Sequence, residues 1–161
     1  MTIDAEVFRV SVDMPFAIAV VRSSRAELLS ISLGQKPECD SGELPSVLVE
    51  ARRQLRAYLN DPRWGFDLPL EKGGTDFQRK VWAALFAIPP EQTKTYGQLA
   101  AELGSGPRAV AQACRANGFP IIVPCHRVVA TKGLGGYAGH IDGPWLNFKR
   151  WLLEHEGARF A

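Results

Sequence analysis

The sequence lacks the features that mark membrane and secreted proteins. No apolar run approaches the ~20 residues that a membrane-spanning helix requires, so we expect no membrane span. The first six residues contain two acids and no base, unlike the basic start of a secretory signal. These absences favour an intracellular protein.

Cysteine and histidine are both scarce, with three of each among the 161 residues. Cys39, Cys114 and Cys125 are odd in number and have no paired spacing, so we expect reduced thiols and no disulfide framework. No CxxC or HxxxH pair occurs. The sequence therefore predicts no zinc or other metal site.

Charge is nearly balanced overall, at a formal +2, but its distribution is uneven. Residues 1–72 carry nine Lys/Arg and eleven Asp/Glu, a net charge of −2, whereas residues 73–161 carry ten and six, a net charge of +4. The C-terminal half is the better partner for a polyanion, although a bias this mild does not establish nucleic-acid binding.

The first half of the chain has the pattern of a small sheet followed by one helix. Three runs rich in Val, Ile and Phe predict strands at residues 6–12, 16–22 and 28–33. Ser46 is expected to cap a helix that extends to about Asn60. Gly73 and Gly74 then mark the boundary that we expect between residues 1–72 and residues 73–161.

The second half has the pattern of a mainly helical unit. Thr75 and Thr95 are each followed three residues later by glutamine, and this spacing predicts a capping box at the start of two helices. Pro107 suits the first position of a further helix that runs to about Ala116. We also expect a short strand at residues 121–123 and a last amphipathic helix at residues 145–156.

Residues 95–117 have the spacing of a helix-turn-helix. Two short helices are joined by a turn of about three to four residues. Arg108 lies in the first turn of the second helix, where its side chain can reach into a groove. An ordinary helical hairpin with a solvated Arg108 fits the same stretch, so both interpretations stay open on this evidence.

The pentapeptide Pro124-Cys125-His126-Arg127-Val128 is the strongest candidate for a reactive site. A thiolate is the nucleophilic form of cysteine, and a neighbouring imidazole and guanidinium both favour it. Neighbours on a strand point to opposite faces, so His126 reaches the sulfur directly only if the backbone turns there, and otherwise acts through a water. The alternative is that Cys125 is an inert buried residue at the end of an apolar run.

Taken together, these motifs resemble the O6-alkylguanine-DNA alkyltransferases, the methylated-DNA–protein-cysteine methyltransferases. The likeness extends from about Gly74 to Gly157. It is carried by residues 75–82 (TDFQRKVW), 95–100 (TYGQLA), 108–110 (RAV), 117, 121–128 (IIVPCHRV), 136–139 (GYAG) and 151–157 (WLLEHEG).

The resemblance implies a site and a mechanism. Cys125 would accept the alkyl group in a single irreversible turnover, with His126 taking the thiol proton through a water and Glu156 orienting His126. Two further residues would contact the DNA: Tyr96 at the 3′ phosphate, and Arg108, which would fill the space that the flipped base leaves. Asn117 would support the active-site turn. Val128 would contact the edge of the guanine, and Tyr137 would donate to the leaving base. No cofactor is implied.

The resemblance also implies an α+β fold, a partner and a location. Residues 1–72 would form a small ribonuclease-H-like sheet-plus-helix subdomain, and residues 73–161 a mainly helical catalytic subdomain with a helix-turn-helix. The partner would be double-stranded DNA bearing O6-alkylguanine, bound through the minor groove with the base flipped, by a monomer. The location would be cytoplasmic and nucleoid-associated, or nuclear in a eukaryote.

Three departures from the family pattern affect these expectations. Ala138 stands where serine is frequent, and Ala111 where glycine is frequent. The loop at residues 138–148 is longer than usual, which leaves the tolerance for bulky adducts open. Two rival functions also remain, a non-catalytic lesion sensor and a cysteine hydrolase that uses Cys125 and His126.

Overall fold

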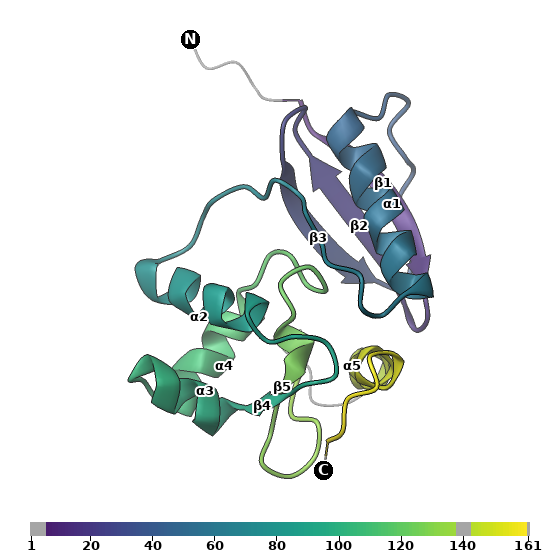
Figure 1. Ribbon diagram of the computed structural model, residues 1–161. Helices are drawn as coiled ribbons and strands as arrows, with labels where there is room; N and C mark the ends of the chain where they lie inside the picture. The colour runs from purple at the N-terminus through teal and green to yellow at the C-terminus, as the bar shows by residue number, and fades with distance from the viewer. Residues whose placement is uncertain (1–5, 138–142, 161) are drawn as a thin grey trace. The chain divides into compact units, whose positions relative to one another are not determined.

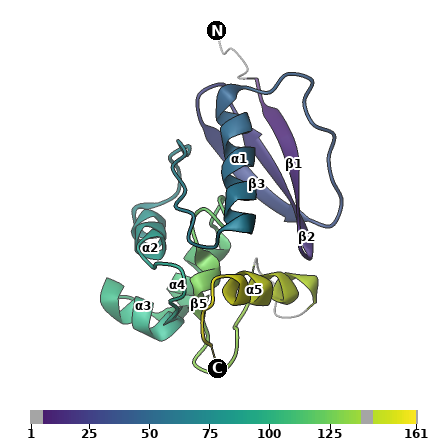
Figure 2. The same cartoon turned by 45° about the vertical axis from the view of Figure 1, so that its right-hand side comes forward.

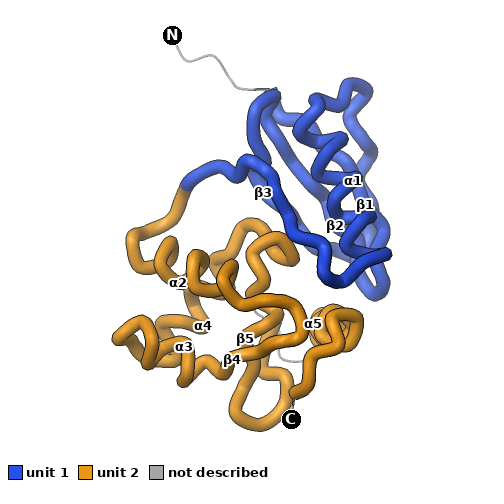
Figure 3. The backbone as a smooth tube through the Cα atoms, viewed as in Figure 1, with its two compact units in different colours: residues 1–72 blue, residues 73–161 orange. Residues whose placement is uncertain are grey.

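The computed structural model describes residues 6–137 and 143–160. The chain divides into two compact units, Met1–Lys72 and Gly73–Ala161 (Figure 3). Within the described residues, five α-helices accompany a three-stranded antiparallel sheet, which confirms the α+β class. None of the described helices is both long and apolar enough to cross a bilayer.

Unit 1 is a sheet with one helix across it. The strands are β1 (Phe8–Met14), β2 (Ala17–Ser23) and β3 (Leu28–Gly34), in the order β1-β2-β3. Every second residue of β1 is buried, because successive side chains of a strand point to opposite faces. Helix α1 (Ser46–Asn60) lies over one face of this sheet (Figures 1 and 2), with Leu48, Leu55 and Tyr58 buried.

The start of α1 differs from the expectation that Ser46 caps it. Ser46 is the first helical residue, and Pro45 holds the cap position without any side-chain hydrogen bond. The Pro45 carbonyl instead accepts hydrogen bonds from the backbone N–H groups of Leu48 (3.0 Å) and Val49 (3.1 Å). The prediction of a serine cap was therefore wrong by one residue, because the chain turns into the helix at the proline.

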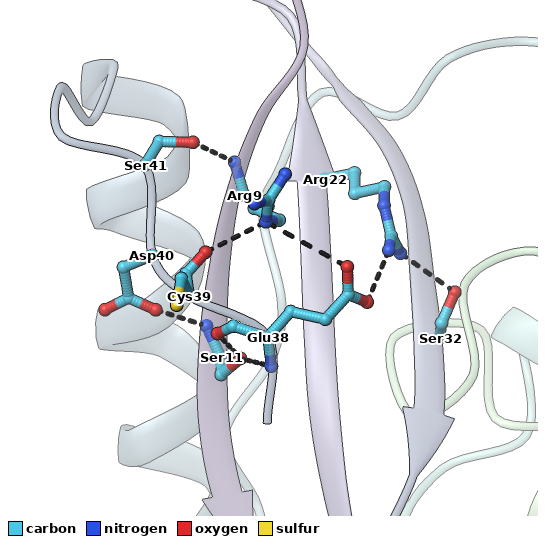
Figure 4. A network of polar contacts seen from close by, with 8 residues as sticks. All are labelled: Arg9, Ser11, Arg22, Ser32, Glu38, Cys39, Asp40 and Ser41. Carbon is cyan, nitrogen blue, oxygen red and sulfur yellow. Dashed lines mark hydrogen bonds and ion pairs between the residues drawn. The ribbon is translucent and has the colours of Figure 1, made fainter. Parts of the chain in front are cut away.

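A polar loop covers the outer edge of β1 (Figure 4). Arg9 and Ser41 exchange two hydrogen bonds of 2.9 Å, one from each backbone N–H. The Ser11 N–H donates to Asp40 Oδ1, also at 2.9 Å. An uncovered edge strand is a template for unwanted pairing, so these bonds protect the sheet from association with other strands.

Unit 2 begins with two helices that carry the predicted caps. They are α2 (Asp76–Phe86) and α3 (Tyr96–Leu103). In each case the N-cap threonine accepts a hydrogen bond from the glutamine N–H three residues on, and the glutamine side chain accepts one from the threonine N–H. Both predicted capping boxes are confirmed, at Thr75 and at Thr95.

Helices α3 and α4 (Pro107–Arg115) form the predicted pair around a tight turn. Gly104 ends α3 in the left-handed conformation, with φ of 64°, which glycine adopts without strain. Pro107 is the first residue of α4, as expected. Arg108 and Gln112 are exposed on the outer side of α4, whereas Val110 and Ala113 are buried.

The strand expected at residues 121–123 is absent from the described structure. Ile121 and Ile122 lie in a turn, and Ile121 has a φ of 78°. The Asn117 side chain closes this turn, since its Nδ2 donates to the Val123 carbonyl at 2.8 Å and its Oδ1 accepts from the Phe119 N–H at 3.0 Å. The apolar run is buried, but as a turn rather than the predicted strand.

Candidate active site

Cys125 opens a short 3₁₀ turn, η1 (Cys125–Arg127), instead of continuing a strand. The Cys125 N–H donates to the Val123 carbonyl at 2.8 Å, the same oxygen that the Asn117 amide binds. Asn117 therefore fixes the backbone immediately before the thiol. The chain reversal that the sequence left open is present, and it begins at the cysteine.

A two-residue parallel pairing brings two distant segments together behind this turn. Strands β4 (Lys94–Thr95) and β5 (Val128–Val129) pair with Lys94 opposite Val128. Tyr96 follows β4 directly, and Val128 follows η1 directly. Two of the predicted site residues, 32 positions apart in the sequence, are thereby held beside the reactive turn.

The Cys125 thiol is buried, with 8% of the residue exposed. Burial raises the pKa of this thiol above its ordinary value, while the Asn117 side chain, the positive charge of Lys149 and the backbone act in the opposite direction. The resting thiol is therefore neutral near pH 7, and its ionisation depends on groups that accept its proton or stabilise its charge.

His126 is a fully buried imidazole with a defined tautomer. Its Nε2 lies 2.8 Å from Glu156 Oε2, and burial lowers the His126 pKa. A neutral ring facing an ionised carboxylate carries its hydrogen on Nε2, so Nδ1 is the acceptor. Among the described residues, Nδ1 has no hydrogen-bond partner. This buried atom is able to receive a proton.

Glu156, the residue that ends the last helix, joins His126 to Arg127. Arg127 donates to Glu156 from Nε (2.9 Å) and Nη2 (3.0 Å), and to the Ile88 carbonyl from Nη1 (2.6 Å). Burial acts to raise the pKa of Glu156, but His126 and Arg127 lower it to about 2. Arg127 thus serves the carboxylate, whereas the sequence interpretation had assigned its charge to the thiol.

Sequence reasoning missed Lys149, which is fully buried on α5 (Pro144–His155). Its positive charge opposes the rise that burial causes in the pKa of Cys125, as the Asn117 side chain also does. A signal was present in the sequence, because Lys149 lies three and four residues before the core residues Leu152 and Leu153. A charged residue on the apolar face of a helix is the observation that could have identified it.

Tyr96 and Tyr137 flank the loop that follows β5. The Tyr96 hydroxyl donates to the Gly136 carbonyl at 3.5 Å, and burial is the main cause of the raised pKa of Tyr96. Tyr137 is buried, and its ring packs against Phe148 with centroids 6.0 Å apart. A cavity of about 360 Å³ adjoins this loop and is lined by Leu134, Gly135, Gly136, Leu146 and Arg150.

The remaining expectations have mixed outcomes. The structure brings Tyr96, Asn117, His126, Val128 and Glu156 around the Cys125 turn through the contacts given above, whereas Arg108 is exposed at the start of α4. The first five residues of the loop expected at 138–148, Ala138 included, lie outside the described residues. Residues 144–148 belong to α5, so the expected end of the loop at Phe148 was wrong. Across residues 6–137 and 143–160, no group of three His, Cys, Asp or Glu side chains could hold a metal ion.

Unit 2 therefore combines the paired helices α3 and α4 with a buried thiol and with a buried imidazole that is bound to a carboxylate. Residues 76–158 match the family description "6-O-methylguanine DNA methyltransferase, DNA binding domain". The match spans about half of the chain, and this chain belongs to that family.

Curated relatives and solved structures agree with this assignment. The constitutive methylated-DNA–protein-cysteine methyltransferase of Bacillus subtilis is 48% identical over 109 residues, which are 64% of this chain and 66% of that protein. The Salmonella typhimurium protein is 54% identical over 88 residues, which are 53% of this chain and 48% of that protein. The aligned segment thus spans 66% and 48% of the length of these two relatives.

The likeness in structure extends over nearly the whole chain. A crystal structure of the O6-methylguanine methyltransferase of Mycobacterium tuberculosis superposes with a TM-score of 0.79 at 34% identity, covering 94% of this chain and 93% of that one. A structure of the same bacterium's protein in complex with DNA gives a TM-score of 0.76 at 35% identity, covering 91% of each chain.

Proposed function

We propose that this protein repairs DNA by direct, irreversible transfer of the alkyl group from O6-alkylguanine to Cys125. The observation that carries the proposal is the buried cluster of Cys125, His126 and Glu156 in a unit that matches the family's DNA-binding domain. The sulfur attacks the alkyl carbon, the S–C bond forms, the C–O6 bond breaks, and the electron pair remains on the guanine.

The thiol loses its proton as its sulfur gains the alkyl group. His126 Nδ1 accepts this proton through a water, and the Glu156 carboxylate stabilises the imidazolium that forms. The guanine takes up one proton on leaving, with Tyr137 as its donor. The product is an S-alkylcysteine, so each molecule reacts once.

The substrate is a base in duplex DNA, which must leave the stack before the thiol can reach it. Flipping costs a few kcal/mol and is therefore a step that the protein must assist. Arg108, which is exposed at the start of α4, fills the space that the flipped base leaves in the stack. Tyr96 acts on the phosphate on the 3′ side of that base. The backbone around Val128 reads the base, and a monomer binds through the minor groove.

The two units have different roles in this proposal. Residues 73–161 bind DNA and carry out the transfer, and residues 1–72 form a reduced ribonuclease-H-like subdomain, which the three-stranded sheet with one covering helix supports. The protein acts in the compartment that holds DNA, the cytoplasm of a bacterium or the nucleus of a eukaryote.

Intact-mass analysis tests the proposal against its rivals. After incubation with a duplex carrying one O6-methylguanine, we expect the protein to gain one methyl group in place of one hydrogen, located on Cys125 by peptide mapping. A lesion sensor would bind the duplex and show no mass gain, and a hydrolase would turn over esters without keeping the group. A Cys125→Ser variant that still removes the methyl group would refute the assignment.

The role given to Arg108 requires its own measurement. Arg108→Ala should slow repair of duplex DNA at least tenfold while leaving the reaction with free O6-benzylguanine unchanged, because a free base needs no flipping. Equal losses in both assays would show that Arg108 supports the fold or the chemistry instead.

A further inference from the structure

Helix α4 is anchored by one face and exposes the other. Val110 and Ala113 are buried, and the indole Nε1 of Trp82, from α2, donates to the Ala113 carbonyl at 2.8 Å. The Trp82 ring is itself confined, because a methyl group at Gly74 would lie 2.5 Å from one of its carbons. Gln112, the outward-facing neighbour of Ala113, therefore extends from a backbone that is held in place.

Three long polar side chains leave the exposed face of α4. Arg108, Gln112 and Arg115 are exposed and are spaced four and three residues apart, which places them along one face of the helix. Pro107 and Ala111 are also exposed, but their side chains have no polar atom. Recognition of a partner by hydrogen bonds from this face therefore depends on the three polar residues.

Gln112 differs from the two arginines in its hydrogen-bonding chemistry. A guanidinium has donors only, whereas the amide of glutamine has two donors on Nε2 and an acceptor, Oε1. The Gln112 side chain forms no hydrogen bond to another residue that the structure describes, so both groups can bind a partner. On the exposed face of α4, Gln112 is thus the residue whose side chain can accept a hydrogen bond.

This difference corresponds to a chemical difference in the minor groove of DNA. Every base pair presents acceptors there, N3 of the purine and O2 of the pyrimidine, and a G·C pair adds one donor, the N2 amino group of guanine. An arginine donates to the acceptors of any pair and does not distinguish A·T from G·C through them. An amide that donates to guanine N3 and accepts from the N2 amino group distinguishes the two.

We propose that Gln112 is a specificity-determining residue, which reads the amino group of a guanine near the lesion and makes the repair rate depend on the surrounding sequence. The inference rests on the proposed function, in which the protein binds the minor groove and Arg108 fills the space left by the flipped base. Gln112 lies about 6 Å along the helix from Arg108. Base pairs are about 3.4 Å apart, so the guanine lies one or two pairs from the lesion.

Duplexes that differ by a single amino group test the proposal. Each carries one O6-methylguanine and one guanine, placed one or two pairs to either side of it, with A·T pairs at the other neighbouring positions. In the twin of each duplex, hypoxanthine replaces that guanine; it lacks the N2 amino group but keeps N3 and still pairs with cytosine. The rate of methyl transfer to Cys125 is followed by intact mass, at protein concentrations below saturation.

Two variants separate the amide from the rest of the protein. Gln112→Met keeps the length of the side chain and removes its donors and its acceptor, and methionine is as good a helix former as glutamine. Gln92→Met is the matched control, because Gln92 is exposed and belongs to unit 2 but lies outside α4. The rate of each protein with free O6-benzylguanine, which has no neighbouring bases, normalises its rates with the duplexes.

We expect the wild type to prefer guanine to hypoxanthine, at one of the four positions, more strongly than Gln112→Met does. One hydrogen bond of this kind changes a rate about two- to tenfold, so the guanine-to-hypoxanthine rate ratio should be at least about twofold higher in the wild type. Comparison of the ratios cancels the weaker pairing of hypoxanthine with cytosine, because both proteins meet the same duplexes. Gln92→Met should have the wild-type ratio.

Other outcomes have distinct meanings. A wild type that neither the duplexes nor O6-benzylguanine modify refutes the proposed function itself. A modified wild type whose ratio equals that of Gln112→Met at all four positions refutes the role of Gln112 alone. A ratio that falls equally in Gln92→Met also contradicts that role, because the discrimination would then not depend on α4. If Gln112→Met does not fold, Gln112→Ala takes its place in the comparison.

Discussion

Replacing Glu156 with glutamine removes one negative charge from the buried cluster of unit 2 while keeping the size of the side chain. The carboxylate accepts from His126 Nε2 (2.8 Å) and from two nitrogens of Arg127 (2.9 and 3.0 Å). In the glutamine variant, an amide N–H group replaces one of the accepting oxygens and faces the N–H groups of His126 or Arg127. The buried guanidinium also loses its counter-ion. Breaking a buried pair in this way costs about 3–5 kcal/mol, which is the loss that we expect at pH 7.

The pH dependence of stability gives a second estimate of the free energy of unfolding that the Glu156 carboxylate contributes. The pKa of Glu156 is about 2 in the folded protein, against an ordinary value of 4.5. A depressed carboxyl pKa contributes stability that is fully present above 4.5 and is lost as the pH falls toward 2. The difference between the two values corresponds to about 3 kcal/mol. Wild type and Glu156→Gln should therefore converge in stability as the solution is acidified.

Urea unfolding followed by circular dichroism, at pH 7 and at about pH 3, measures both quantities. Glu102→Gln is the matched control, because Glu102 is half exposed and binds Lys94 Nζ through both oxygens (2.9 and 2.8 Å). An exposed pair of this kind is worth less than about 1 kcal/mol. A Glu156→Gln loss no larger than that of the control, or one that is the same at both pH values, would refute this account of the buried cluster.

Three further substitutions probe the elements that position the site. Asn117→Ala removes the bond to the Val123 carbonyl, and we expect a loss of about 2 kcal/mol together with an alkylation rate at least tenfold lower, measured by denaturant unfolding and with O6-benzylguanine. Thr95→Ala removes the side-chain cap of α3 and should lower stability by about 1 kcal/mol with an unchanged urea m-value. Gly135→Ala places a methyl group 3.1 Å from a carbon of the Tyr96 ring at a φ of 72°, so the melting temperature should fall; an unchanged value would show that the loop yields freely.

Local signals in the sequence predicted the elements that are set by local chemistry. The capping boxes at Thr75 and Thr95 involve partners three residues apart, and a bond of that range depends little on the rest of the fold. The runs rich in Val, Ile and Phe predicted the strands of unit 1 from composition, because branched and aromatic side chains favour strands. Such elements are visible before any tertiary contact is known.

The wrong strand at residues 121–123 shows where this reasoning ends. A run of Ile, Ile and Val favours a strand by composition, because branched side chains suit a pleated, half-buried surface. The conformation is decided instead by the Asn117 side chain, which binds backbone groups at both ends of the run and folds it into a turn. The deciding residue lies outside the apolar run, and its amide has no effect on the composition of that run.

The buried charges of unit 2 follow from the chemistry that surrounds Cys125 rather than from the needs of the fold. An apolar cluster of the same volume would be as stable or more so, because each buried ion must recover its desolvation cost through its partners. Yet Arg127, Glu156 and Lys149 are all buried in a unit of 89 residues, next to a buried imidazole. Strongly perturbed groups that gather around one nucleophile are typical of a reaction site. The energetic cost therefore argues for function: Glu156 fixes the tautomer of His126 and Arg127 keeps Glu156 ionised, so the loss of either residue should reduce reactivity more than its effect on stability explains.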